Sequence, residues 1–185
     1  MDKFMLDKEN TALLIIDIQE RLVAAIKDKV GEAVVNNCQH LIEISKMLNM
    51  PITLTEQYPK GLGQTVNEIK NSLPEYKPIE KLAFNCCYEP NFINEIKKLN
   101  KKTIILTGIE THICVLQTCM GLLKEGYNVH VVRDAVCSRT KENWQAGVEF
   151  MRDAGAVVTC TEIVLFQLLK VAGTEEFKAI SKRIK

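Results

Sequence analysis

The sequence predicts an α/β fold, in which a six-stranded and mostly parallel sheet lies between two layers of helices. Two observations support this prediction. Short apolar segments rich in β-branched residues recur along the chain, and stretches with the period of an α-helix separate them. Helical connections of this length join parallel strands by right-handed crossovers, which cover both faces of the sheet. The expected architecture is therefore a three-layer, Rossmann-like α/β/α arrangement.

The first half of the chain contains three predicted strands and one long helix. An uninterrupted apolar run ends at Asp17, which is typical of a strand buried on both faces. Apolar residues spaced three or four apart mark the helix, and Pro51 closes it. The strands are expected at residues 12–16, 52–55 and 77–82, and the helix at residues 30–48.

The second half repeats this alternation. Leu116, Cys119 and Leu123 share one face of a predicted helix that follows Gly108, and Gly126 ends this helix. The remaining strands are expected at residues 102–107, 129–132 and 156–160, a further helix at residues 140–153, and two helices at the end of the chain.

Length and composition predict one domain over residues 1–185. Of the 185 residues, 46% are hydrophobic, which is enough for a substantial core. The chain has 24 Lys and Arg against 23 Asp and Glu and an estimated pI near 7.5, so it offers no basic stripe for nucleic acid or acidic lipid. No run approaches the ~20 apolar residues of a membrane span or the core of a signal peptide. We therefore expect a cytoplasmic protein without nucleic-acid or membrane partners.

The seven cysteines are expected to be free thiols. Their number is odd and no CxxC pair occurs, so the sequence indicates neither a disulfide framework nor a cysteine zinc site. Most of them need no function, because a free cysteine packs as a small hydrophobic side chain.

Three residues are candidates for catalysis because they follow predicted strands, whose carboxyl ends border the ligand crevice of a parallel sheet. Asp17 follows the first strand, and it could instead cap the next helix. Cys114 falls in the first turn of a helix if Thr111 is the N-cap, where the helix dipole favours a thiolate, but taken alone a cysteine in a chain with seven is more often a core residue. Lys81 precedes an apolar segment that could hold its stem, but as an isolated residue it is more typical of a solvated surface lysine.

Four segments in order resemble the signatures of the isochorismatase-like cysteine hydrolases. They are Leu13-Leu14-Ile15-Ile16-Asp17-Ile18-Gln19, Lys81-x-x-Phe84, residues 107–118 (TGIETHICVLQT) and residues 131–139 (VVRDAVCSR). The resemblance extends from about residue 11 to residue 169, and residues 55–63 are similar to a branch of uncharacterised isochorismatase-domain proteins.

The resemblance implies an Asp–Lys–Cys triad on Asp17, Lys81 and Cys114. It also implies a cis peptide bond between Ile109 and Glu110, and an oxyanion hole formed by the backbone N–H groups of Glu110 and Cys114. Candidate substrate contacts are Gln19, Tyr58, Phe84 and Ile113. By family analogy the protein forms a homo-oligomer.

Two departures from the family restrict the function that the resemblance implies. Nicotinamidases of this family carry an Asp-x-His metal motif after the second strand, whereas this chain has Glu56-Gln57-Tyr58, so we expect no metal and no cofactor. True isochorismatases lack the nucleophilic cysteine, so Cys114 argues against vinyl ether cleavage. The leading hypothesis is a metal-independent cysteine hydrolase of a small amide or related carbonyl or imine compound, acting through a thioester-type intermediate. The alternative is a binding or scaffold protein with a vestigial pocket.

Overall fold

The computed structural model describes residues 2–27 and 29–184 and confirms the predicted architecture. Six strands form one sheet in the order β3-β2-β1-β4-β5-β6, and all of the strand pairs in it are parallel. The strands are β1 (Thr11–Ile16), β2 (Ile52–Gln57), β3 (Ile79–Lys81), β4 (Thr103–Ile109), β5 (Asn128–Cys137) and β6 (Val157–Thr159). Each predicted strand is therefore present.

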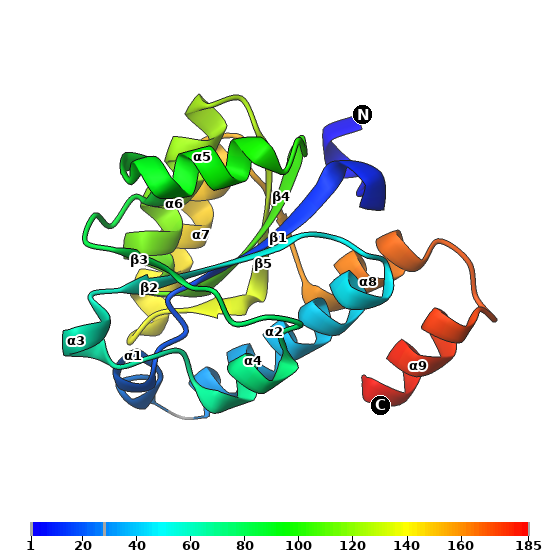
Figure 1. Ribbon diagram of the computed structural model, residues 1–185, viewed down its shortest axis with the longest axis horizontal. Helices are drawn as coiled ribbons and strands as arrows, with labels where there is room; N and C mark the ends of the chain where they lie inside the picture. Colours follow the sequence, from blue (N-terminus) through cyan, green and yellow to red (C-terminus); the bar gives the residue numbers. More distant parts are fainter. Residues whose placement is uncertain (1, 28, 185) are drawn as a thin grey trace.

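Helices cover both faces of the sheet (Figure 1). One layer contains α5 (Pro90–Lys98), α6 (Leu116–Lys124) and α7 (Lys141–Asp153), and the other contains α2 (Val30–Met47), α4 (Asn67–Ser72), α8 (Thr161–Leu169) and α9 (Glu175–Arg183). Two short helices, α1 (Glu20–Ala24) and α3 (Pro59–Leu62), lie side by side beyond the carboxyl ends of β1 and β2.

The central strand β1 supplies apolar side chains to both layers. Leu13 and Ile15 belong to the core cluster that includes α2 and α8, whereas Leu14 and Ile16 belong to the cluster that includes α5, α6 and α7. Burying one such side chain contributes roughly 1.5–3 kcal/mol. The two-sided burial of this strand confirms what the uninterrupted apolar run predicts.

The helices that the sequence analysis did not identify are short or carry few core residues. Helix α5 buries only Phe92 and Ile96, in a segment that is otherwise polar, so its apolar pattern is weak. The predicted strand at residues 129–132 continues to Cys137, with a shift in register opposite Leu106 and Gly108 of β4. The exposed pair Arg133-Asp134 interrupts the apolar pattern near this shift, so the pattern alone ends the strand before the buried residues 135–137.

Gly108 is required where β4 passes β1. Its φ is +125°, and a Cβ atom built on it would lie 2.0 Å from the backbone oxygen of Ile16. A side chain cannot fit there, so glycine brings the end of β4 close to the residue that precedes Asp17.

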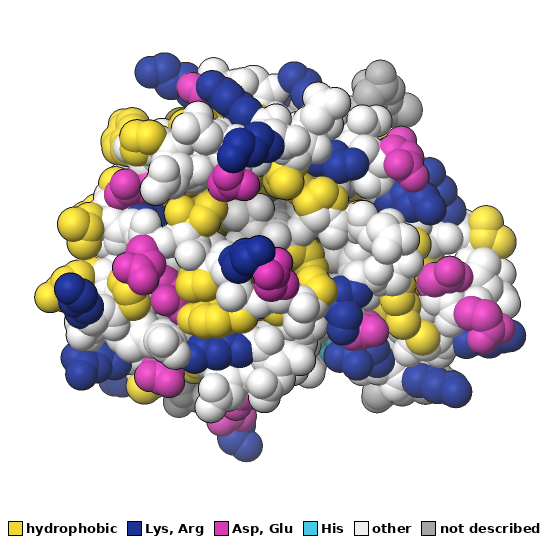
Figure 2. Space-filling model, in the orientation of Figure 1, with side chains coloured by type: hydrophobic (Ala, Val, Ile, Leu, Met, Phe, Trp, Pro, Cys, Tyr) yellow, Lys and Arg dark blue, Asp and Glu magenta, His cyan; other side chains and the backbone are white. Residues whose placement is uncertain are grey.

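Acidic and basic side chains alternate on the face drawn in Figure 2, and neither sign dominates it. Over the described residues, no helix is long and apolar enough to cross a membrane.

Candidate active site

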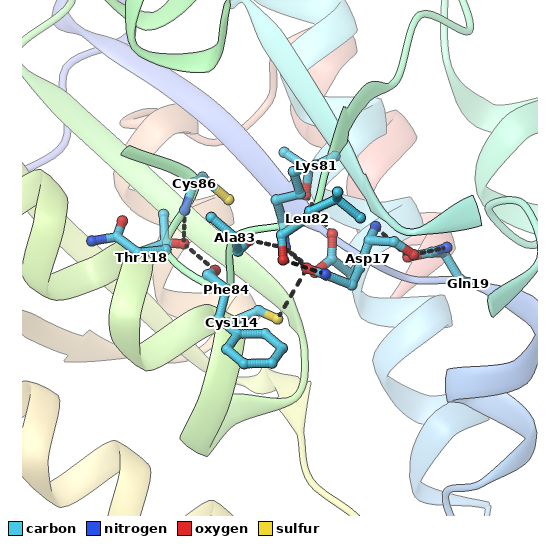
Figure 3. Close-up of polar contacts among 12 residues, drawn as sticks. Asp17, Gln19, Lys81, Leu82, Ala83, Phe84, Cys86, Cys114 and Thr118 are labelled. Atoms are coloured by element: carbon cyan, nitrogen blue, oxygen red, sulfur yellow. Dashed lines mark hydrogen bonds and ion pairs between the residues drawn. The ribbon is translucent and has the colours of Figure 1, made fainter. Parts of the chain in front are cut away.

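Four neighbouring strands deliver polar side chains to one edge of the sheet. Asp17 directly follows β1, Gln57 ends β2, Lys81 ends β3, and Cys114 lies in the turn after β4. Figure 3 shows Asp17, Lys81 and Cys114 in one cluster, although Lys81 follows Asp17 by 64 positions and Cys114 follows Lys81 by 33. The structure thus brings together the three residues that the resemblance implies.

Asp17 and Lys81 form a fully buried ion pair. Lys81 Nζ lies 2.7 Å from Asp17 Oδ2, and both side chains are 0% exposed. Thr55 Oγ1 donates a hydrogen bond of 2.7 Å to the other carboxylate oxygen, Oδ1. Asp17 has a φ of +50°, which costs a non-glycine residue about 1–2 kcal/mol. The backbone therefore accepts a strained conformation at the residue that holds the carboxylate.

Gln57 is a member of this cluster that the sequence analysis did not name as a site residue. Its Oε1 accepts a 2.6 Å hydrogen bond from Lys81 Nζ, and its Nε2 donates to the backbone oxygen of Leu82 at 2.8 Å. The second bond fixes the amide so that its oxygen faces the ammonium. With Ala83 O at 3.3 Å and Asp17 Oδ2, three oxygen atoms surround an ammonium that has three N–H groups. The position of Gln57 at the end of β2 was the signal that could have identified it.

Cys114 is nearly buried and lies against Gln57. Its side chain is 5% exposed, and its Sγ is 4.0 Å from Gln57 Oε1. It lies in a π-helical turn, Thr111–Val115, which leads into α6. The expectation that Thr111 is the N-cap is wrong: Glu110 occupies that position, because the turn begins one residue earlier, and the Thr111 hydroxyl has no hydrogen-bond partner among the described residues.

Burial and charge set the protonation of the cluster. Burial raises the pKa of Asp17, and the Lys81 ammonium opposes this effect. Burial raises the pKa of the Cys114 thiol, the Asp17 carboxylate raises it further, and Lys81 lowers it. Burial acts to lower the pKa of Lys81, but Asp17 and the nearby thiols outweigh it, so this pKa is raised. Lys81 is therefore charged at neutral pH, and Cys114 holds its proton until a base removes it.

A pocket of about 330 Å³ opens beside Cys114. Most of its lining is apolar, and it includes two of the candidate substrate contacts, Phe84 and Ile113. The complete lining is Arg21, Leu22, Ala25, Gln57, Leu62, Phe84, Ile109, Glu110, Ile113, Cys114 and Arg139.

The other two candidate contacts lie outside this lining. Gln19 is 0% exposed, and its amide bonds the backbone of Gln57 through both N–H and C=O and also the oxygen of Gly63. It therefore holds the end of β2 in place and does not face the pocket, so the substrate contact expected of it is not supported. Tyr58 is half exposed and borders a neighbouring hollow that also includes Lys81 and Leu82.

One backbone feature that the resemblance implies is present beside Cys114. The peptide bond between Ile109 and Glu110 is cis. The carbonyl oxygen of Glu110 accepts hydrogen bonds from the amides of Ile113 and Val115, which lie on either side of Cys114. His112 points elsewhere, since its Nδ1 lies 2.9 Å from Ser138 Oγ and 3.5 Å from Glu110 Oε2.

Glu56, which stands where nicotinamidases carry a metal motif, is engaged in hydrogen bonds. Its Oε1 accepts from Thr65 N at 2.6 Å, from Thr65 Oγ1 at 2.7 Å and from the Tyr76 hydroxyl. In the part of the chain that the structure describes, no group of three or more His, Cys, Asp or Glu side chains could hold a metal ion.

Comparisons with known proteins agree with this fold. The family model of the isochorismatase domain matches residues 11–163. The secreted isochorismatase effector Isc1 of Phytophthora sojae is 41% identical over 161 residues, which are 82% of this chain and 74% of that protein. The fold and these matches define an isochorismatase-like hydrolase. The chain belongs to the isochorismatase family.

Solved structures give the same fold over nearly the whole chain. MAR1 ribonuclease from Caenorhabditis elegans is similar with a TM-score of 0.89 and 38% identity, covering 97% of this chain and 92% of that one. YcaC from Pseudomonas aeruginosa, solved with hexane-2,5-diol and covalent acrylamide, has a TM-score of 0.90 and 29% identity, with coverage of 97% and 91%. YcaC from Escherichia coli, described as an octameric hydrolase of unknown specificity, has a TM-score of 0.90 and 26% identity, with coverage of 97% and 90%.

Proposed function

We propose that the protein is a metal-independent cysteine hydrolase that acts on a small amide, or on a related carbonyl or imine compound. Asp17, Lys81 and Cys114 are the proposed catalytic residues. The observation that carries this proposal is the fully buried Asp17–Lys81 pair beside Cys114. Desolvating two charges costs several kcal/mol per ion, so such a pair is a poor way to stabilise a fold. Strongly shifted pKa values in a cleft are instead typical of a catalytic site.

The first half of the proposed reaction acylates the enzyme. Asp17 accepts the proton of the Cys114 thiol, and Lys81 stabilises the thiolate by its charge. The sulfur then bonds to the carbonyl carbon, and the electron pair of the C=O bond moves to oxygen. The backbone N–H groups of Glu110 and Cys114 hold this oxyanion. Asp17 returns its proton to the nitrogen as the C–N bond breaks, which leaves a thioester and an amine.

The second half releases the acid. A water molecule gives one proton to Asp17 while its oxygen bonds to the thioester carbon. The C–S bond breaks as the tetrahedral intermediate collapses, and the sulfur recovers a proton from Asp17. The raised pKa of Asp17 suits a carboxylate that accepts and returns a proton in each half-reaction.

A panel of small amides tests this proposal. Wild-type protein is expected to release ammonia or amine from at least one of them, and Cys114→Ala is expected to release none. Cys119→Ala is the matched control, because Cys119 is a buried cysteine on α6 that packs only in the core. Mass spectrometry should find the acyl group on the Cys114 peptide after an acid quench. Full turnover by Cys114→Ala would refute the assignment.

The size of the pocket supports a small molecule as the substrate. A hollow of about 330 Å³ with mostly apolar walls suits a compound of a few heavy atoms. One structural neighbour is named a ribonuclease, so RNA belongs in the panel as a negative expectation. We also propose that the protein works in a reducing compartment such as the cytoplasm, since all seven cysteines are free.

We further propose that the protein forms a homo-oligomer. Large apolar side chains lie exposed on the loop after β3, at Leu82, Phe84 and Tyr88. A neighbour with the same fold is octameric by its own description. Light scattering on the purified protein should give a mass that is a multiple of 20.9 kDa, and a monomer at micromolar concentration would contradict this proposal.

A further inference from the structure

One positive charge at the mouth of the catalytic pocket has no ion-pair partner in the part of the chain that the structure describes. Three charged side chains line the pocket: Arg21, Arg139 and Glu110. Arg139 Nε donates a 2.5 Å hydrogen bond to Glu110 Oε1, so these two charges balance each other. Arg21 forms no ion pair within residues 2–27 and 29–184. The charged groups of the lining therefore sum to one uncompensated cation.

The guanidinium of Arg21 is held in place. Its Nη1 donates a 2.6 Å hydrogen bond to the backbone oxygen of Gly61, which joins α1 to α3 across the mouth. A guanidinium has five N–H donors, and this bond uses one of them. The remaining donors form a planar fork of the kind that binds a carboxylate. An unanchored surface arginine would have to lose side-chain freedom first, whereas much of that freedom is already lost here.

The rest of the lining is mostly apolar, and together with Arg21 it determines which substrates the pocket favours. Leu22, Leu62, Phe84 and Ile113 surround the pocket with apolar surface, whereas Arg21 is exposed, so its charge acts at the mouth, where the effective dielectric constant lies between that of water and that of the interior. A substrate without charge would gain from these walls but would form no ion pair with Arg21. A substrate with a negative group at the end remote from the scissile bond would gain from the apolar walls and would also pair with Arg21.

We infer that Arg21 determines specificity, and that the natural substrate of the pocket carries a carboxylate or a similar anionic group in addition to its reactive carbonyl. This inference rests on the proposed function, because it takes Cys114 as the reacting residue. Arg21 touches the remote end of the substrate and takes no part in the chemistry at Cys114.

The test uses two reagents of nearly equal size that differ in charge. Iodoacetate is an anion and iodoacetamide is neutral, and each transfers its carbon to a cysteine sulfur with loss of iodide. The rate of each at Cys114 is followed by peptide mass spectrometry, with the partly exposed Cys87 and Cys160 as internal references in the same digest. The measured quantity is the iodoacetate-to-iodoacetamide rate ratio at Cys114. Labelling needs no turnover, so a failed hydrolysis assay would leave this result standing.

Arg21→Gln is expected to lower this ratio about fivefold at low ionic strength, the scale of one charge contact at a partly solvated site. Added salt should shrink the difference between wild type and variant. Arg152→Gln is the matched control, since Arg152 is an exposed arginine on α7 outside the pocket lining, and it should leave the ratio unchanged.

Three results would overturn the inference. The ratio could be equal in wild type and Arg21→Gln, or it could fall equally in Arg152→Gln, which would mean that only the total charge matters. Iodoacetamide could also label Cys114 in wild type while iodoacetate labels only Cys87 and Cys160, which would mean that the pocket does not admit small acids.

As an independent readout, glutaramate and its neutral isostere 5-methylhexanamide can be compared as protectors of Cys114. Wild type is expected to be protected better by the anion, and Arg21→Gln to lose this preference. A purely structural role of Arg21 would weaken protection by both compounds equally.

Discussion

Removing the ammonium of Lys81 should destabilise the fold more than any loss of packing explains. In Lys81→Met an apolar side chain of similar length would face three oxygen atoms that now surround Nζ: Asp17 Oδ2, Gln57 Oε1 and Ala83 O. Breaking a buried ion pair by removing one partner costs about 3–5 kcal/mol, because a charge is left buried without compensation. We expect the free energy of unfolding to fall by about this amount at pH 8.

The pH dependence of this loss has a definite sign. Burial already raises the pKa of Asp17, and without Lys81 this pKa rises further. A carboxyl group with a raised pKa in the folded state contributes stability at low pH and loses it as the pH rises through that pKa. The deficit of Lys81→Met should therefore shrink toward pH 5, by up to about 1.4 kcal/mol per pH unit.

Urea unfolding of four proteins measures the effect: wild type, Lys81→Met, Asp17→Asn and the double variant. The double variant should be more stable than Lys81→Met, because it buries no charge at this position. The reasoning would be refuted by a Lys81→Met deficit below about 1 kcal/mol, a size typical of surface pairs. The reasoning would also fail if the Lys81→Met loss in the free energy of unfolding grew toward pH 5, or if the loss of the double variant equalled the sum of the two single losses.

Two further predictions concern Gly108 and Gln57. Gly108→Ala should lower the free energy of unfolding in urea by at least about 2 kcal/mol, since its Cβ would lie 2.0 Å from Ile16 O. Gly155→Ala, also at positive φ but with nothing within 4 Å, should lower it by about 1 kcal/mol. Equal losses would mean that the contact with β1 does not determine the cost. Gln57→Leu should lower kcat with little change in KM and shift the pH profile of Cys114 alkylation, because Lys81 loses a hydrogen-bond acceptor. If this variant changes only the free energy of unfolding, Gln57 does not orient Lys81.

The sequence predicted the sheet well because buried parallel strands leave a direct signal. The run from Ala12 to Ile16 is apolar throughout, and all of these residues are buried from both sides. Helix α5 was missed because only Phe92 and Ile96 anchor it. The end of β5 was missed because the exposed pair Arg133-Asp134 interrupts the apolar pattern before the buried residues 135–137. An apolar pattern in the sequence detects a strand that is buried along its whole length, and it does not detect how strands pair in the sheet.

The candidate site was predictable in its residues but not in its geometry. Position at the carboxyl end of a strand and the resemblance together pointed to Asp17, Lys81 and Cys114. Neither could reveal that Gln57 lies between Lys81 and Cys114, because that depends on side-chain hydrogen bonds across strands. For Gln19 the motif suggested a substrate contact, and the structure adds hydrogen bonds from its amide to the backbone of Gln57 and Gly63, which the sequence could not reveal.

The central claim is that Asp17, Lys81 and Cys114 act as one electrostatic unit. The most direct measurement is the pH profile of Cys114 alkylation by iodoacetamide in wild type, Asp17→Asn and Lys81→Met. Since Asp17 raises the pKa of the thiol and Lys81 lowers it, Asp17→Asn should shift the profile to lower pH and Lys81→Met to higher pH. Asp17→Asn should thus react faster with the reagent while it loses amide turnover. Three superimposable profiles would contradict the account.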